Sequence, residues 1–234
     1  MPHIAGMLLK LTPLLLAIGY ALLMLRFSVW QTKRMLDANS KPLTGDPLNQ
    51  VAERMAEALG VDRIPIHIYE IDAVNGLASP DGRIFLTRGF LAARARGAVT
   101  DDELASVIAH ELGHVAHGHI RRRMIDFTGQ NTVFIMLSAL LNRFLPFIGI
   151  WIANLISTAL MARLSRRDEF EADAYASALL TKSGIGTAPQ KSLFQKLEAL
   201  TGARGAEIPV WLRSHPKTAE RIAAIEALEA RWGL

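Results

Sequence analysis

The chain of 234 residues contains no cysteine, which excludes disulfide bonds and coordination of a metal by thiolates. A metal ion bound by this chain must therefore use nitrogen and oxygen ligands. Without cysteines, the sequence also gives no indication of the redox compartment in which the protein works. Internal repeats and low-complexity tracts are absent as well.

A large excess of charge is also missing, because the net charge is only +4 although the pI is about 9.6. A dense basic run, Arg121-Arg122-Arg123, directly precedes an apolar segment. Arginines in that position suit contact with anionic lipid headgroups, and a solvated helix face is the simpler alternative. We therefore expect no nucleic-acid partner.

Apolar residues are abundant, since 50% of the chain is hydrophobic and the mean hydropathy is +0.21. This value is high for a soluble protein and predicts that some segments face lipid. The length suits one folded domain with a hydrophobic core and a small appendage.

The most informative segment is His110-Glu111-x-x-His114. Thr100 and Glu103 form a capping-box pattern, which predicts a helix that begins near Thr100. Residues four apart lie on one face of a helix, so His110 and His114 can bind a single metal ion. Glu111 is then placed to take a proton from a metal-activated water that attacks a carbonyl. The segment thus predicts metal-assisted hydrolysis of a peptide bond.

A second segment, from Glu169 to Asp173, has the same four-residue spacing. On a helix, Glu169 can supply a third metal ligand, and Asp173 can accept a hydrogen bond from the distal nitrogen of a ligand histidine. A solvated acidic helix face is the alternative for this segment alone. His117 and His119 are predicted not to bind the metal, because a continuing helix would turn His119 away from the site.

These segments resemble the membrane zinc proteases of the HtpX and CAAX-prenyl-protease type. The resemblance covers most of the chain and rests on three ordered motifs: His110-Glu111-x-x-His114, residues 165–173, and His215-Pro216 followed by Arg221. It implies a gluzincin-like fold and one Zn²⁺ per chain, with polypeptide substrates.

The resemblance also implies a role for each motif residue. His110, His114 and Glu169 would be the zinc ligands, Glu111 the general base, and Asp173 the support of the first histidine.

Three further roles follow from the resemblance alone. His215 and Arg221 would stabilise the oxyanion of the tetrahedral intermediate. Asn75 would belong to an edge strand that aligns an extended substrate through backbone hydrogen bonds. Alternatives exist for two of them: His215 before Pro216 also suits a helix N-cap, and Asn75-Gly76 also suits a type I′ hairpin turn.

The first segment expected to face lipid lies at the N-terminus. Its uncharged centre, residues 11–25, is flanked by Lys10 and Arg26, whose long side chains can reach the headgroups. A cleaved signal peptide is the alternative, but no small-x-small cleavage site follows the apolar run. We predict a transmembrane anchor over residues 1–32.

The flanking charges predict the orientation of this anchor. Arg26, Lys33 and Arg34 follow the apolar run, whereas only Lys10 and the terminal amine precede it. The positive-inside rule then places the remaining chain in the cytoplasm, at the inner (plasma) membrane. Because the difference is small, a non-cytoplasmic orientation is the alternative.

A second apolar region, residues 133–162, separates the two metal motifs and is interrupted near Asn142 to Pro146. This pattern predicts a helical hairpin. Its second arm, residues 144–161, is near the lower limit for spanning a bilayer, and burial against the rest of the chain satisfies the same pattern.

The remaining elements are a helix over residues 47–59 that Gly60 ends, strands over residues 64–69 and 83–87, and a final helix over residues 216–231. The predicted fold class is α+β, mostly helical with a small β-sheet. The catalytic domain is expected over residues 46–232.

The sequence therefore predicts a membrane-anchored, zinc-dependent endopeptidase of membrane or misfolded proteins, in contact with the lipid bilayer. A non-proteolytic zinc-binding scaffold or chaperone-like protein is the alternative from another class. A prenyl-protein protease is a narrower alternative, which the short chain disfavours.

Overall fold

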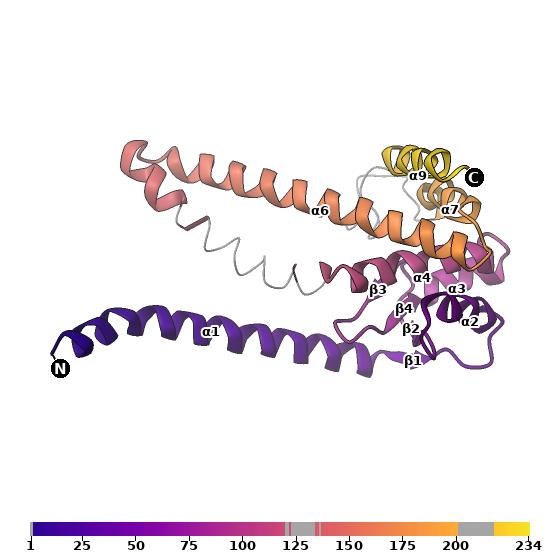
Figure 1. The fold of residues 1–234 in the computed structure, drawn as a ribbon, viewed down its shortest axis with the longest axis horizontal. Coiled ribbons are helices and arrows are strands. Elements are labelled where there is room, and N and C mark those ends of the chain that lie inside the picture. Colours follow the sequence, from indigo (N-terminus) through magenta and orange to yellow (C-terminus); the bar gives the residue numbers. More distant parts are fainter. Residues whose placement is uncertain (1, 120–121, 123–133, 136, 201–217) are drawn as a thin grey trace. The chain divides into compact units, whose positions relative to one another are not determined.

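The computed structural model describes residues 2–119, 122, 134–135, 137–200 and 218–234 (Figure 1). The chain divides into two compact units. The first comprises Met1–Leu36 and Arg121–Ser157, and the second comprises Asp37–Ile120 and Thr158–Leu234. All metal motifs belong to the second unit.

The second unit contains a four-stranded mixed sheet with the strand order β1-β2-β4-β3. Its strands are β1 (Ser40–Pro42), β2 (Ile66–Tyr69), β3 (Gly76–Ala78) and β4 (Ile84–Thr87). β2 and β4 pair in parallel, whereas β1 and β3 pair antiparallel to their neighbours. The order leaves β3 at an edge of the sheet.

The sheet confirms two predicted strands and decides between two interpretations of Asn75-Gly76. Gly76 begins β3 and is absent from the glycines with positive φ, which a type I′ turn would require. The chain instead reverses between Ser79 and Arg83, where Gly82 has a φ of 87°. The hairpin-turn interpretation is therefore wrong, and the edge-strand interpretation fits.

Helix α2 (Leu48–Leu59) lies between β1 and β2 in sequence, and α3 (Arg88–Ala95) directly follows β4. α2 ends at Gly60, as predicted, because Gly60 adopts the left-handed conformation with a φ of 70°. α2 packs on α4 (Asp101–Ala116), and both contribute buried apolar residues to one core with β2 and β4.

The N-terminus of α4 confirms the predicted capping box. The Thr100 hydroxyl accepts a hydrogen bond from the Glu103 backbone N–H, and the Glu103 carboxylate accepts one from the Thr100 backbone N–H. Glu103 also binds Ser192 and Lys196 of α7 (Ala188–Leu200). The buried Glu103 carboxylate thus caps the N-terminus of α4 and also holds α4 against α7.

The second metal motif lies on α6 (Gly149–Lys182), a helix of 34 residues. The apolar arm predicted to end near residue 161 therefore continues without a break into the motif. α6 ends before Gly184, which has a φ of 72°, and α7 and α9 (Thr218–Trp232) complete the second unit. The described part is mostly helical with a small sheet, which confirms the α+β class.

The first unit contains most of α1 (Pro2–Ala38) and most of the region of the predicted hairpin. Residues 137–144 are helical, residues 145–148 turn, and α6 follows. At this turn the backbones approach closely, since a Cβ on Gly149 would lie 2.6 Å from Asn142 N. The predicted interruption is thus confirmed, two to three residues further along.

The expected transmembrane anchor over residues 1–32 has no support from the helices. Among the residues that the structure describes, no helix combines the length and apolarity needed to cross a membrane.

Candidate metal centre

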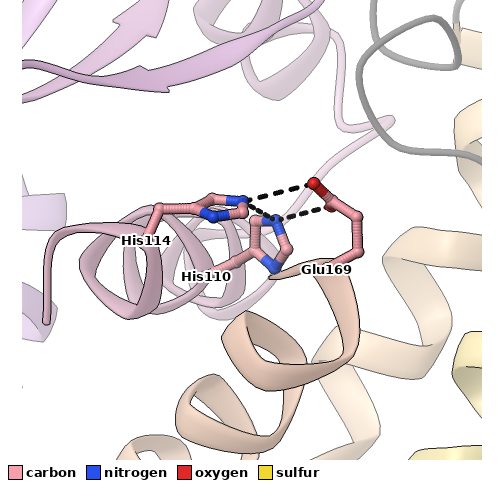
Figure 2. A group of neighbouring side chains, drawn as sticks. All are labelled: His110, His114 and Glu169. Carbon is pink, nitrogen blue, oxygen red and sulfur yellow. Dashed lines mark hydrogen bonds and ion pairs between the residues drawn. The ribbon is translucent and has the colours of Figure 1, made fainter. Parts of the chain in front are cut away.

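The site begins on α4. The capping box fixes where this helix starts, and the buried apolar face of α4 sets its rotation about the helix axis. His110, Glu111 and His114 are all buried. Figure 2 shows the two imidazoles extending from α4 toward Glu169, which comes from α6. His110 and His114 thus lie on one face of α4, as their spacing predicted.

A close approach of backbones brings the two motifs together. A Cβ added to Gly113 would lie 2.8 Å from both Cα and O of Ala172. Only glycine permits this distance, because a side chain would have to displace the backbone of α6. Gly113 lies between the two ligand histidines in sequence, and Ala172 lies between Glu169 and Asp173. The contact therefore sets the distance between the candidate ligands His114 and Glu169, which are 55 residues apart in sequence.

The three predicted ligands converge on one point. The Nε2 atoms of His110 and His114 are 3.1 Å apart, and the two oxygens of Glu169 lie 3.4 Å from His110 Nε2 and 3.5 Å from His114 Nε2. A tetrahedral ion with bonds of about 2.0–2.1 Å would hold such donors about 3.3–3.4 Å apart. The donor set and its spacing thus fit a zinc-sized ion.

The opposite nitrogen of His110 is held by a buried ion pair. His110 Nδ1 lies 2.9 Å from Asp173 Oδ1, to which it donates when Nε2 faces a metal. Arg221 of α9 donates to both oxygens of Asp173, from Nε at 2.6 Å and from Nη2 at 2.7 Å. The guanidinium also lies 4.2 Å from the centre of the Phe194 ring. Arg221 therefore fixes Asp173, which in turn fixes His110.

Without a metal, these charges move the pKa of His110 strongly. Burial lowers it, but the bonds to Asp173 and Glu169 outweigh burial and raise the pKa of His110 to about 9. Burial likewise raises the pKa of Asp173, but the Arg221 charge and the hydrogen bonds from Arg221 and His110 together outweigh it, so that pKa lies below its ordinary value. Metal binding must therefore displace a proton from His110 near neutral pH.

Glu111 lies outside the ligand trio and beside the edge strand. A Cβ on Gly76 would lie 2.5 Å from Val107 Cγ1 and 3.5 Å from Glu111 Oε1. The absence of a side chain at Gly76 thus lets β3 approach α4 at the level of this carboxylate. The Glu111 carboxylate thus lies against the edge strand, on the same helix as the candidate ligands His110 and His114.

Two other predicted residues have different outcomes. Asn75 directly precedes β3, and its backbone exchanges hydrogen bonds with Thr87 of β4. Its side-chain oxygen is buried and has no hydrogen-bond partner within the described part of the chain. His215 lies outside the described residues.

His119 was missed as a member of the site. α4 ends at Ala116, and Gly118, with a φ of 67°, turns the chain so that the buried His119 returns to His114. Their Nδ1 atoms are 2.9 Å apart. Burial lowers the pKa of His119. The helical projection that excluded this residue continued the helix too far, and Gly118 was the available signal.

A His-Glu-x-x-His helix that faces a buried glutamate of a second helix defines a metallopeptidase site. The comparisons with known proteins agree with this class. The chain belongs to peptidase family M48, whose model matches residues 42–229.

Several curated relatives are metalloproteases. The chain is 30% identical over 192 residues to metalloprotease LoiP of Escherichia coli, covering 79% of this chain and 73% of LoiP. It is 26% identical over 244 residues to a protease HtpX homolog of Desulfotalea psychrophila, covering 90% and 85%. Human mitochondrial metalloendopeptidase OMA1 is 25% identical, with 70% of this chain but only 32% of OMA1 covered. The protein is thus a metalloendopeptidase of the HtpX-like group.

The backbone contact between the motifs gives a first prediction. We expect Gly113→Ala to lose about 1–3 kcal/mol of stability by overpacking and to weaken metal binding, because α6 must move away. Isothermal titration with zinc and urea unfolding would measure both. Leu112→Ala, at a half-buried neighbour, is the control that loses stability but keeps its zinc affinity. Unchanged zinc affinity in Gly113→Ala would contradict the prediction.

Proposed function

We propose that this metalloendopeptidase is a zinc enzyme that cleaves extended segments of membrane or misfolded proteins. The observation that carries the proposal is the position of Glu111, which is buried against Gly76 of the edge strand and directly follows the candidate ligand His110 on α4. A non-catalytic zinc scaffold has no use for a base at this position.

Zinc is proposed because the ligands would be two imidazoles and a carboxylate, the chain has no thiolate, and the donor spacing suits bonds of about 2.0–2.1 Å. His110, His114 and Glu169 would hold one ion per chain. Bound there, zinc would supply Lewis acidity, which polarises a carbonyl and lowers the pKa of a water to about 7.

The protein's own residues would carry the proton and hold the substrate. Glu111 takes the proton of the attacking water and passes it to the leaving amine. The free edge of β3, beginning after Asn75, pairs with an extended peptide through backbone hydrogen bonds. Backbone pairing selects for an unfolded segment rather than for a side-chain sequence, which suits misfolded proteins as substrates.

The support of the oxyanion is proposed for His215, by resemblance. For Arg221, the bidentate bond to Asp173 favours orientation of His110 over direct contact with the substrate, since its Nε and Nη2 atoms already donate to that carboxylate.

Membrane association is proposed for residues 1–32 and for the hairpin at 133–162. The catalytic domain is proposed for residues 46–232, a range that includes the hairpin. Most of the exposed large apolar side chains of the described residues belong to the first unit, among them Leu23, Phe27, Phe147, Trp151 and Leu155. Exposed apolar surface of this kind marks contact with lipid or another protein. The flanking charges favour a cytoplasmic catalytic domain at the inner membrane.

The test is metal removal from the full chain in detergent. We expect about one zinc per chain by mass spectrometry, cleavage of an unfolded casein, and loss of nearly all cleavage after dialysis against 1,10-phenanthroline. Zinc should restore cleavage and magnesium should not, because nitrogen ligands disfavour magnesium. Cleavage that persists without zinc would refute the zinc mechanism. Zinc-loaded protein that cleaves neither unfolded nor membrane-embedded substrates would favour the scaffold alternative.

A further inference from the structure

His119 lies in a position that the proposed mechanism does not use. Its side chain is fully buried, although it follows the end of α4 by three residues. The neighbouring His117 caps the helix and is exposed, with its ring stacked on that of His119 at 5.3 Å between centroids. Burial of one histidine of the pair requires a compensating set of hydrogen bonds.

Those bonds are available at both ring nitrogens. Nδ1 lies 2.9 Å from His114 Nδ1, and Nε2 lies 3.1 Å from Glu171 Oε2 and 3.5 Å from Asp168 Oδ1. Both carboxylates come from α6, where Asp168 directly precedes Glu169 and Glu171 directly precedes Ala172. His119 therefore connects the second ligand histidine on α4 with α6.

The contact between two Nδ1 atoms determines the hydrogen positions. One of the two nitrogens must donate and the other must accept. Nε2 of His114 faces the other two candidate ligands, His110 and Glu169, and needs a lone pair to bind a metal there. The hydrogen of neutral His114 is therefore on Nδ1. His119 then accepts at Nδ1 and carries its own hydrogen on Nε2, which faces two carboxylate oxygens. This assignment satisfies every nitrogen, and the opposite one would leave Nε2 of His119 facing carboxylates without a hydrogen.

The Glu171 carboxylate, at the far end of this series of hydrogen bonds, is also held in place. Arg167 donates from Nε to Glu171 Oε1 at 2.7 Å, leaving Oε2 for His119. The arrangement parallels that of the other ligand, in which Arg221 fixes Asp173 and Asp173 fixes His110. Each ligand histidine thus has its own support from a carboxylate and an arginine, with one additional imidazole in the case of His114.

We propose that His119 is a positioning residue that orients His114 for metal binding and holds it in the tautomer with a free Nε2. The inference rests on the proposed role of His114 as a ligand. His119, Asp168 and Glu171 also lie close enough to one another to be considered as a second cation site. The positioning role is favoured because Glu171 is already paired with Arg167, and His119 Nε2 carries the hydrogen.

The test measures zinc affinity by competition with a chelator, in the full chain in detergent. His119→Leu removes the acceptor, and we expect the zinc Kd to rise about 10- to 100-fold, the usual effect of losing such a partner. His119→Asn places an amide oxygen near the former Nδ1 and should recover most of the affinity. His117→Leu is the matched control and should bind zinc like the unmodified chain.

A spectroscopic measurement separates positioning from a general structural role. In the cobalt-substituted protein, we expect the visible absorption bands to shift in His119→Leu and to return in His119→Asn, because they report the geometry of the ligands. A variant that only loosened the fold would change the unfolding temperature without this pattern. If His119→Leu does not fold, Asp168→Ala with Glu171→Ala removes the acceptors of Nε2 and should weaken zinc binding in the same direction.

Three results would overturn the proposal. The first is an unchanged Kd in His119→Leu, or in the double alanine variant where the leucine variant does not fold. The second is an asparagine variant as weak as the leucine variant. The third is two zinc ions in the unmodified chain and one, with unchanged affinity, in His119→Leu, which would indicate a second metal site. Failure of the proposed metal centre has a different signature, since His114→Ala would then keep its zinc.

Discussion

Glu111→Gln is expected to abolish peptide hydrolysis while zinc remains bound. Glutamine has nearly the same size as glutamate and keeps one acceptor oxygen, but it cannot take a proton. General acid–base catalysis contributes about 10²- to 10⁴-fold, so cleavage of an unfolded protein should fall by at least that range. Because Glu111 is not one of the three converging ligands, the metal content should stay near one per chain.

The comparison needs metal analysis and cleavage rates on the same preparations. Glu226→Gln, an exposed change of the same type on α9, is the matched control and should keep full activity. Loss of zinc together with activity in Glu111→Gln would mean that Glu111 supports the metal rather than the proton transfer. Retention of more than about a tenth of the activity would assign the base to another group.

The parts of the fold that the sequence predicted best are set by local interactions. The capping box of Thr100 and Glu103 and the left-handed Gly60 depend on residues within one or two turns, and both were found as expected. The edge position of β3 and the parallel pairing of β2 with β4 depend on tertiary packing. Nothing in the spacing of those strands specified their order.

The shared face of His110 and His114 could be predicted because helix periodicity converts sequence spacing into a common direction. The supporting residues could not be placed in the same way. His119 depends on where α4 ends, and Arg221 reaches Asp173 across 48 positions of sequence. The approach of Gly113 to Ala172 is equally nonlocal, although the glycine within the motif was visible. Local rules thus identified the candidate ligands, and tertiary contacts determine which residues hold them in place.

Arg221→Met is expected to destabilise the zinc-free protein by about 3 kcal/mol, the lower end of the usual loss on breaking a buried pair. Both side chains of the pair are almost fully buried, so the change leaves the charge of Asp173 without its bidentate partner. The loss stays at the lower end because His110, whose pKa is raised to about 9, carries a proton at pH 7 and partly compensates Asp173. Urea unfolding of the metal-free chain at pH 7 would measure it.

A second substitution separates the charge from the packing of the arginine. Asp173→Asn removes the buried charge and keeps an oxygen that accepts from His110 Nδ1. The double variant Asp173→Asn with Arg221→Met should therefore be less destabilised than the sum of the two single variants. Additive losses would mean that Arg221 acts mainly through its contact with the Phe194 ring.

The pH dependence of the folding stability tests the same ion pair between Asp173 and Arg221. Burial raises the pKa of Asp173, but the charge and hydrogen bonds of Arg221, with the hydrogen bond from His110, together hold it below its ordinary value of 3.8 in the folded protein. A carboxyl with a lowered pKa contributes stability that is complete above its unfolded pKa and is lost as pH falls through the folded one. The stability difference between the unmodified chain and Arg221→Met should therefore be constant between about pH 5 and pH 8 and shrink below about pH 4. A difference that persists unchanged into acid would exclude the ion pair as the source of the stability and would leave Arg221 with a packing role alone.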